Sequence, residues 1–276
     1  MEMETVSQTR SHGGMQGVYR HQSRETGTEM TFSVFVPDHA PGATMPVLWY
    51  LSGLTCTHAN VTEKGEFRAA CAEHGIIFIA PDTSPRGEGV PDAEGYDFGQ
   101  GAGFYVDATQ TPWAANFRMR SYIEDELSAL IGAEFAAVDM ARQGITGHSM
   151  GGHGTWQLAS LFPDRFAAAA PSAGWISFAS YGSGNGIDAA TPIGAILARA
   201  SLPSDTLKFR DNLTRMGVYV LHGDADDNVP VSQARAMRAE LGQFHPDFAY
   251  HEQPGQGHWW GNECVDWPPL LRFLEE

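Results

Sequence analysis

The chain of 276 residues is poor in cysteine and in basic residues, and it has no long apolar run. Its three cysteines, Cys56, Cys71 and Cys264, form neither an even disulfide set nor a CxxC pair, which favours reduced thiols and a cytoplasmic location. Lys and Arg number 17 against 33 Asp and Glu, and the net charge of −16 disfavours nucleic acid and anionic membranes as partners. No stretch approaches the roughly 20 apolar residues of a membrane helix, and the polar residues 1–14 lack the apolar core of a signal peptide.

Signatures of metal and cofactor chemistry are also missing. No His, Cys and Asp cluster has the spacing of a metal site, no GxxxxGK[ST] phosphate loop occurs, and no GxGxxG follows a strand in a nucleotide-binding setting. We therefore expect neither a metal nor a cofactor. Hydrophobic residues make up 42% and charged residues 18% of the chain, which is typical of a folded soluble enzyme.

Apolar strands alternate with helical segments along the chain. Continuous apolar runs predict strands covered on both faces, as in a parallel sheet, at 47–51, 76–80, 167–172 and 217–222. Helices are expected over 63–74, 121–135 (opened by a capping box at Ser121), 152–162, 193–200, 231–241 and 265–276. The segments 17–23 and 30–36 predict an antiparallel hairpin in front of them. This order predicts one α/β domain over residues 1–276, with a mostly parallel sheet.

Two irregular segments interrupt this alternation. Residues 81–113 form a long expected loop rich in Gly, Asp and aromatic residues, and loops of that length are often functional. Residues 173–216 read as an insertion that would form a lid or a pocket wall.

The chain is organised around the sequence Gly147-His148-Ser149-Met150-Gly151, a GxSxG motif. An expected strand over 142–146 precedes it and an expected helix follows it, which is the context of a nucleophile elbow in an α/β-hydrolase fold. Glycines at both ends leave room for a sharp, strained turn, and the helix N-terminus suits an oxyanion. Because GxSxG also arises by chance in a glycine-rich chain, the motif alone does not decide the function.

A serine nucleophile needs a base and an acid, which follow it in this fold in the order acid, then His. Three aspartates follow the expected strand at 217–222, and we favour Asp226 as the acid. Asp224 would instead form a turn, and Asp227 would cap the next helix.

His258 is the expected base, because it lies in a loop after the last expected strand at 248–252. His245 and His251 are expected at the surface, and His222 is expected to bond beneath the acid loop. His148 and His153 flank Ser149 too closely in sequence to act on its hydroxyl.

The loop 52–57 after the strand 47–51 should supply the second oxyanion donor. We expect the N–H groups of Leu54 and Met150 to hold the oxyanion, unless Ser52-Gly53 is only a turn. Cys56 would be a small neighbour of the site rather than its nucleophile. The expected substrate pocket is completed by side chains from the loop 52–57, the elbow, the insertion and the loop 255–262, namely Cys56, His148, Trp175 and Trp259.

Residues 10–165 resemble the S-formylglutathione hydrolase (esterase D) family. The resemblance rests on Gly13 to His21, Leu51-Ser52-Gly53-Leu54-Thr55-Cys56-Thr57, Ala80 to Gly87, Gly103 to Thr109 with Pro112-Trp113, and Gly147 to Gly154. It implies a cofactor-free thioesterase that splits S-formylglutathione into formate and glutathione, acts on short-chain esters and is usually a homodimer. In this resemblance Ser149 matches the nucleophile, and Leu54 and Met150 match the oxyanion positions.

The back of the chain departs from that pattern. Residues 166–276, including Leu221-His222-Gly223-Asp224-Ala225-Asp226 and Gly257-His258-Trp259-Trp260, are more similar to the catalytic domain of prolyl-oligopeptidase-type serine hydrolases. The chain is therefore interpreted as a mosaic, whether natural or engineered. Both families place the acid at Asp226 and the base at His258.

Three functions follow from these observations. The first is a serine hydrolase of small acyl thioesters and short-chain carboxylic esters, with S-formylglutathione as the leading substrate. The second is a peptidase or acyl-aminoacyl hydrolase, or a general carboxylesterase. The third, a hydrolase-fold binding protein with an inactive site, is disfavoured because all three expected triad residues are present.

Overall fold

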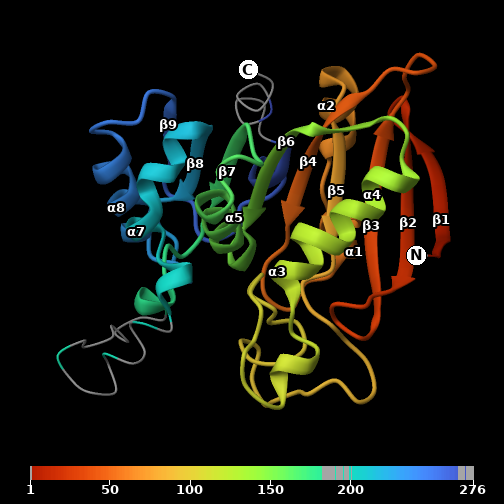
Figure 1. Cartoon of the computed structure of the whole chain (residues 1–276). Coiled ribbons are helices and arrows are strands. Elements are labelled where there is room, and N and C mark those ends of the chain that lie inside the picture. Colours follow the sequence, from red (N-terminus) through yellow and green to blue (C-terminus); the bar gives the residue numbers. More distant parts are fainter. Residues whose placement is uncertain are drawn as a thin grey trace.

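A computed structural model describes residues 2–181 and 201–266, together with residues 190, 195, 199 and 271. Within this part of the chain, nine strands form one sheet in the order β1-β2-β3-β5-β4-β6-β7-β8-β9 (Figure 1). Their bounds are β1 Met3–Ser11, β2 Gly14–Gln22, β3 Glu29–Pro37, β4 Met45–Leu51, β5 Ile77–Pro81, β6 Val138–His148, β7 Ala168–Ser172, β8 Gly217–Gly223 and β9 Phe248–Gln253. Strands β1, β2 and β3 pair antiparallel, β3 pairs antiparallel with β5, and the neighbours from β5 through β9 pair in parallel. The predicted hairpin and the mostly parallel sheet are confirmed.

Helices cover both faces of the sheet (Figure 1). They are α1 His58–Lys64, α2 Phe67–His74, α3 Met119–Ser121, α4 Ser128–Glu134, α5 Met150–Leu161, α7 Thr206–Phe209, α8 Ser232–Leu241 and α9 Glu263–Asp266, and a π-helical segment, η2 Tyr122–Leu127, joins α3 to α4. Four short 3-10 helices also occur in the described segments, η1 Trp113–Ala115, η3 Phe178–Ser180, η4 Leu202–Ser204 and η5 Arg210–Arg215.

Two apolar cores lie on opposite faces of the sheet, because successive side chains of a buried strand point to opposite sides. Trp49 and Leu51 of β4 pack into the core under η2, α4, α5 and α8. Leu48 and Tyr50 of the same strand pack with Phe67 of α2 in the other core. The continuous apolar run of β4 therefore serves both faces, as the sequence predicts.

Helix boundaries differ from the prediction at two places. The helix expected over 63–74 is wrong: Gly65 ends α1 in an extended conformation, and a second helix, α2, starts at Phe67. Helix α1 begins earlier than predicted, because Thr57 and Asn60 form a capping box at its start. The capping box predicted at Ser121 is also wrong, since the Ser121 hydroxyl donates to Asp107 at 2.6 Å and the helix begins at Met119.

Other differences concern the two ends of the chain and the insertion. The prediction missed β1, whose side chains are mostly exposed and show no apolar alternation. The helix predicted over 193–200 lies outside the described residues, apart from two isolated positions. Of the closing helix predicted over 265–276, α9 is described only as far as Asp266. In the described segments, no helix is long and apolar enough to cross a membrane.

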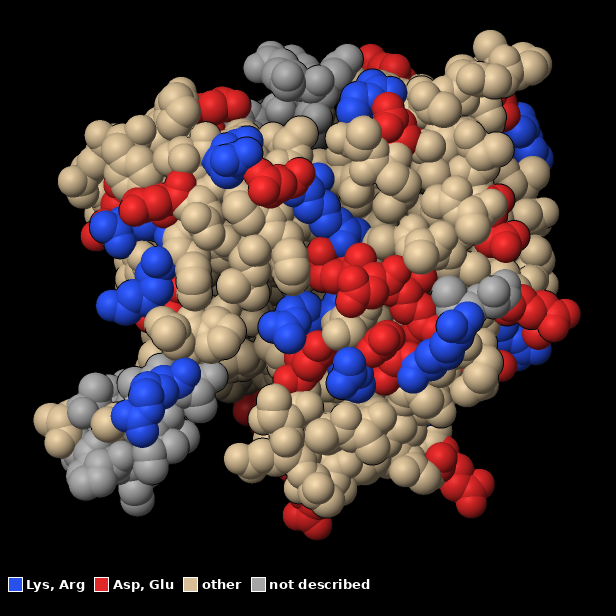
Figure 2. Space-filling model, viewed as in Figure 1, with Lys and Arg blue, Asp and Glu red and all other residues tan. Residues whose placement is uncertain are grey.

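The loops that follow the parallel strands gather at one edge of the sheet, which is the lower edge in Figure 1. The long loop between β5 and η1 extends below this edge. On the face shown in Figure 2, acidic and basic side chains lie next to one another across the middle of the molecule. The excess of negative charge is thus not gathered into a single acidic patch on this face.

Candidate active site

Ser149 lies at the sharp turn between β6 and α5, with φ 61° and ψ −119°. This left-handed conformation costs a non-glycine residue about 1–3 kcal/mol and persists only where the surroundings hold it. A Cβ at Gly151 would lie 1.7 Å from the carbonyl oxygen of Leu51, and one at Gly147 would lie 2.4 Å from that of Gly151. The two glycines of the motif are therefore required by the close approach of β4 and α5.

Asp226 and His258 are joined by a hydrogen bond of 2.8 Å between Oδ2 and Nδ1. The Asp226 side chain is fully buried, and its Oδ1 accepts the backbone N–H groups of Asn228 at 2.9 Å and Val229 at 2.8 Å. Because a carboxylate only accepts, His258 donates from Nδ1, and in the neutral ring Nε2 then carries a free lone pair. The two side chains predicted as acid and base are thus in contact, and their roles stay predictions.

His222 makes a second imidazole contact to the same carboxylate. Its Nε2 lies 2.9 Å from the carbonyl oxygen of Val229 and 3.2 Å from Asp226 Oδ2, so this nitrogen must carry a proton. Burial alone would raise the pKa of Asp226, but the hydrogen bonds from His222 and His258 outweigh it and hold that pKa well below its ordinary value. The predicted contact of His222 beneath the acid loop is present, and it keeps Asp226 ionised.

The two other aspartates of this loop have different positions. Asp224 Oδ1 accepts the backbone N–H of Gly255 at 2.6 Å, which ties the acid loop to the loop that carries His258. Asp227 is exposed and lines the cavity described next.

Ser149 and His258 line the same cavity of about 940 Å³ at the carboxyl edge of the sheet. No hydrogen bond joins the Ser149 hydroxyl to the His258 ring among the described residues. Catalytic hydrogen bonds of this kind often tighten only when substrate is bound. The cavity is also lined by the other residues that the sequence nominates, Leu54, Cys56, His148, Met150, Trp175 and Trp259.

His148 is buried beside these groups. Its Nδ1 lies 3.1 Å from the Ser172 hydroxyl, and its ring centroid lies 4.8 Å from that of His258 and 5.0 Å from that of Trp259. Burial, helped by the nearby His258, lowers the pKa of His148 to about 3. The side chain is therefore neutral near neutral pH and acts as an uncharged wall.

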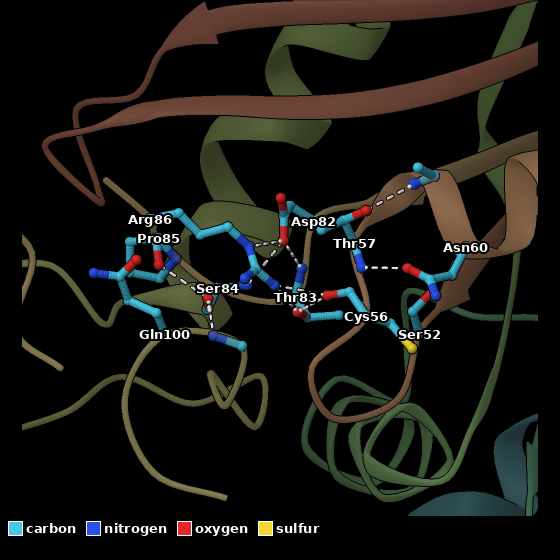
Figure 3. A network of polar contacts seen from close by, with 12 residues as sticks. Ser52, Cys56, Thr57, Asn60, Asp82, Thr83, Ser84, Pro85, Arg86 and Gln100 are labelled. Atoms are coloured by element: carbon cyan, nitrogen blue, oxygen red, sulfur yellow. Dashed lines mark hydrogen bonds and ion pairs between the residues drawn. The ribbon is translucent and has the colours of Figure 1, made fainter. Parts of the chain in front are cut away.

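The loop 52–57 is held from outside by the long loop after β5 (Figure 3). The Tyr105 hydroxyl donates to the carbonyl oxygen of Ser52 at 2.7 Å, and Arg86 Nη2 donates to that of Cys56 at 2.8 Å. Thr55 N–H, in turn, donates to Gly101 at 2.9 Å. The N–H group of Leu54, between these anchors, and that of Met150, at the start of α5, make no hydrogen bond within the described segments.

Asp82 is the centre of the anchoring network in Figure 3. Its Oδ1 accepts from the backbone N–H of Thr83 at 2.6 Å and from Arg86 Nε at 3.1 Å, and so it fixes the Arg86 side chain. The sequence reasoning missed Asp82, Arg86 and Tyr105. Two signals were available: the length and composition of the loop 81–113, and the family motifs Ala80 to Gly87 and Gly103 to Thr109, which contain these residues but gave them no role.

The chain is similar to known esterases. The model of the Esterase family, described as "Putative esterase", matches residues 23–263. The S-formylglutathione hydrolase of Paracoccus denitrificans (strain Pd 1222) is 59% identical over 163 residues, which cover 59% of this chain and 58% of that protein. The S-formylglutathione hydrolase of Mus musculus is 47% identical over 167 residues, which cover 60% and 59%. The matched part thus spans less than two thirds of the length of both curated relatives.

A solved structure extends the similarity to nearly the whole chain. An S-formylglutathione hydrolase from Agrobacterium tumefaciens matches with a TM-score of 0.81 and 37% identity, over 98% of this chain and 95% of that chain. The family model likewise runs through residue 166, where the sequence resemblance changes. The chain therefore belongs to the esterase family and is a relative of the S-formylglutathione hydrolases.

Proposed function

We propose that this chain is a serine hydrolase of small acyl thioesters and short-chain carboxylic esters, and that S-formylglutathione is its substrate. The observation that carries the proposal is the 2.8 Å bond from buried Asp226 to His258, in a cavity that also holds Ser149 at its strained turn. The names of the relatives favour the thioester over other acyl compounds.

The proposed reaction proceeds through an acyl-enzyme. His258 Nε2 takes the proton of the Ser149 hydroxyl as Oγ attacks the substrate carbonyl, and Asp226 stabilises the imidazolium that forms. The N–H groups of Leu54 and Met150 hold the oxyanion, and each such donor is worth about 2.7–4 kcal/mol in the transition state. The carbon–sulfur bond then breaks and His258 returns the proton to the thiolate. Water attacks the formyl-enzyme by the same route and releases formate.

Replacement of Ser149 by Ala tests the proposal. We expect the rate on S-formylglutathione to fall by at least about 10⁴-fold, as when a triad nucleophile is removed. Cys56→Ser is the matched control, because Cys56 lines the same cavity and is the competing nucleophile; it should retain most of the activity. An active S149A variant would refute the mechanism.

A peptidase or acyl-aminoacyl hydrolase is the second candidate. It is favoured by the sequence Leu221-His222-Gly223-Asp224-Ala225-Asp226, which resembles that of prolyl-oligopeptidase-type enzymes. Comparison of S-formylglutathione with an N-acyl-aminoacyl p-nitroanilide separates the two, and we expect turnover of the thioester alone. Failure of the protein to react with a fluorophosphonate would instead revive the binding-protein alternative.

The remaining predictions concern the wall of the substrate pocket, the oligomeric state and the cellular location. We propose that residues 173–216 wall the substrate pocket, because Trp175 and Tyr181 line the cavity. A homodimer and a cytoplasmic location stay predictions from the sequence. No cofactor enters the proposed reaction.

A further inference from the structure

One cation stands out at the rim of the cavity. The chain contains only two lysines, Lys64 and Lys208. Lys64 is the last residue of α1, is exposed, and is the one Lys or Arg side chain that lines the cavity within the described ranges. Arginines elsewhere, such as Arg118 and Arg235, pair with carboxylates, whereas no ion pair engages Lys64 in the described part of the chain.

The chain next to Lys64 packs against the segment that follows His258. The backbone N–H of Glu66, two residues on, donates to Asn262 Oδ1 at 2.7 Å, and a Cβ on Gly65 would lie 3.3 Å from Val265 Cγ1. Asn262 is the last residue of the loop 255–262, which carries His258. Because His258 must protonate the leaving group, that group leaves on the side of this loop.

The charge of Lys64 also acts on the loop 52–57, the oxyanion loop, which carries the Leu54 N–H group. Burial raises the pKa of the Cys56 thiol, and the Lys64 ammonium acts on it in the opposite direction. Lys64 therefore lies within electrostatic range of Cys56, which lines the same cavity.

We propose that Lys64 binds a carboxylate of the leaving thiol and so selects acidic thiols such as glutathione over neutral ones. The inference rests on the proposed function and assigns the part of the substrate that the site recognises. A formyl group is too small to supply much binding energy, so selectivity must come from the leaving group. Glutathione carries carboxylates at both ends, and a protein of net charge −16 repels such an anion unless a local cation attracts it.

The test compares variants of the two lysines on two thioesters with the same acyl group. Lys64→Met removes the charge and keeps a good helix former, Lys64→Arg keeps the charge, and Lys208→Met removes the same charge from α7, away from the lining residues of the cavity. The substrates are S-formylglutathione and the formyl thioester of N-acetylcysteamine, which has no carboxylate. Values of kcat and KM are measured for each pair at low ionic strength.

We expect K64M to lower kcat/KM for S-formylglutathione about 3- to 6-fold, mainly through KM, as for the loss of one partly exposed ion pair. For the N-acetylcysteamine thioester the change should stay within about two-fold. K64R should recover most of the difference, and K208M should show none. In about 1 M salt, where the Debye length is roughly 3 Å, the selective effect should shrink.

Three results would overturn the inference. An equal loss of kcat/KM on both thioesters would assign Lys64 a structural role. An equal effect of K208M would show that only the net charge of the protein matters. No effect of K64M on either thioester would leave Lys64 without a role in substrate selection. These results are distinct from failure of the proposed function, which would appear as a parent protein that hydrolyses neither thioester or that is unaffected by S149A.

Discussion

At the scale of single residues, Asp226 has the most constrained environment in the site. Two backbone N–H groups bond to Oδ1, and two imidazoles contact Oδ2. This arrangement lowers the pKa of the carboxyl, so Asp226 binds a proton more readily in the unfolded chain than in the folded one. The stability that the carboxylate contributes is therefore complete above the ordinary aspartate pKa of 3.8 and is lost as the pH falls toward the lower folded value.

Replacement of Asp226 by Asn tests both of its roles. We expect kcat to fall by about 10⁴-fold, because an amide no longer stabilises the imidazolium or selects the Nδ1–H tautomer. Chemical unfolding at pH 7 should show a less stable variant, and the difference from the parent should shrink below pH 3.8. A difference in unfolding free energy that is independent of pH would contradict the assigned charge state.

At the scale of elements, the approach of α5 to β4 determines the position of the nucleophile. Gly151 of α5 lies against the carbonyl oxygen of Leu51, whereas Gly132 of α4 has only Met140 Cγ near its Cβ position, at 3.5 Å. A side chain at Gly151 would therefore clash with the backbone of β4, whereas the space at Gly132 admits a methyl group.

The pair of variants Gly151→Ala and Gly132→Ala distinguishes these requirements. G132A should raise the free energy of unfolding by about 0.4–1 kcal/mol, because Ala lowers the entropy of the unfolded chain and favours a helix. G151A should lower it by more than about 1–3 kcal/mol and abolish activity, since the backbone must move to accommodate the methyl group. Thermal unfolding measures the stability of the two variants, and a p-nitrophenyl acetate assay measures their activity. A stable, active G151A would contradict the close approach of α5 to β4.

The oxyanion loop is a second element whose position is set from elsewhere. Tyr105 is buried and donates to Ser52, one of the anchors that place the Leu54 N–H. We expect Tyr105→Phe to lower kcat by about 10-fold with little change in KM, because a loosened oxyanion donor affects the transition state more than the bound substrate. Steady-state kinetics on an ester would test this, and a variant with only KM altered would place Tyr105 in substrate binding instead.

The sequence predicts some of these elements better than others. Strands such as β4 and β8 and the elbow at Ser149 follow from local patterns, namely apolar runs and the glycines around a serine. The break between α1 and α2 is not predicted, because Gly65 lies inside an otherwise helical pattern; in the structure Gly65 ends α1 in an extended conformation, with its N–H bonded to the carbonyl oxygen of Val61. Arg86 and Tyr105 bond to Cys56 and Ser52, which are 30 and 53 residues away in the sequence, and no local sequence pattern predicts such contacts.

At the scale of the whole molecule, one continuous sheet joins the two parts that the sequence resemblance separates. Strand β6, from the front part, pairs in parallel with β7 from the back part, from Gly144 opposite Ala168 to His148 opposite Ser172. The proposed nucleophile comes from the front part, and the proposed acid and base come from the back part. The interpretation of the chain as a mosaic stays a prediction. If two sequences were joined here, the pairing of β6 with β7 had to be preserved, because it brings Ser149 close to Asp226 and His258.

The predicted homodimer also belongs to this scale. Light scattering coupled to size exclusion should give twice the chain mass of 30.0 kDa. A mass equal to one chain at micromolar concentration would contradict the prediction without affecting the proposed chemistry, because the candidate residues all come from one chain.

The central claim is that Ser149 becomes acylated with His258 as its base. Rapid acid quench of p-nitrophenyl acetate turnover, followed by peptide mass mapping, tests it directly. We predict an acetyl group on the peptide that contains Ser149, and loss of this adduct in His258→Ala. An acetyl group on the Cys56 peptide instead, or undiminished labelling of Ser149 without His258, would contradict it.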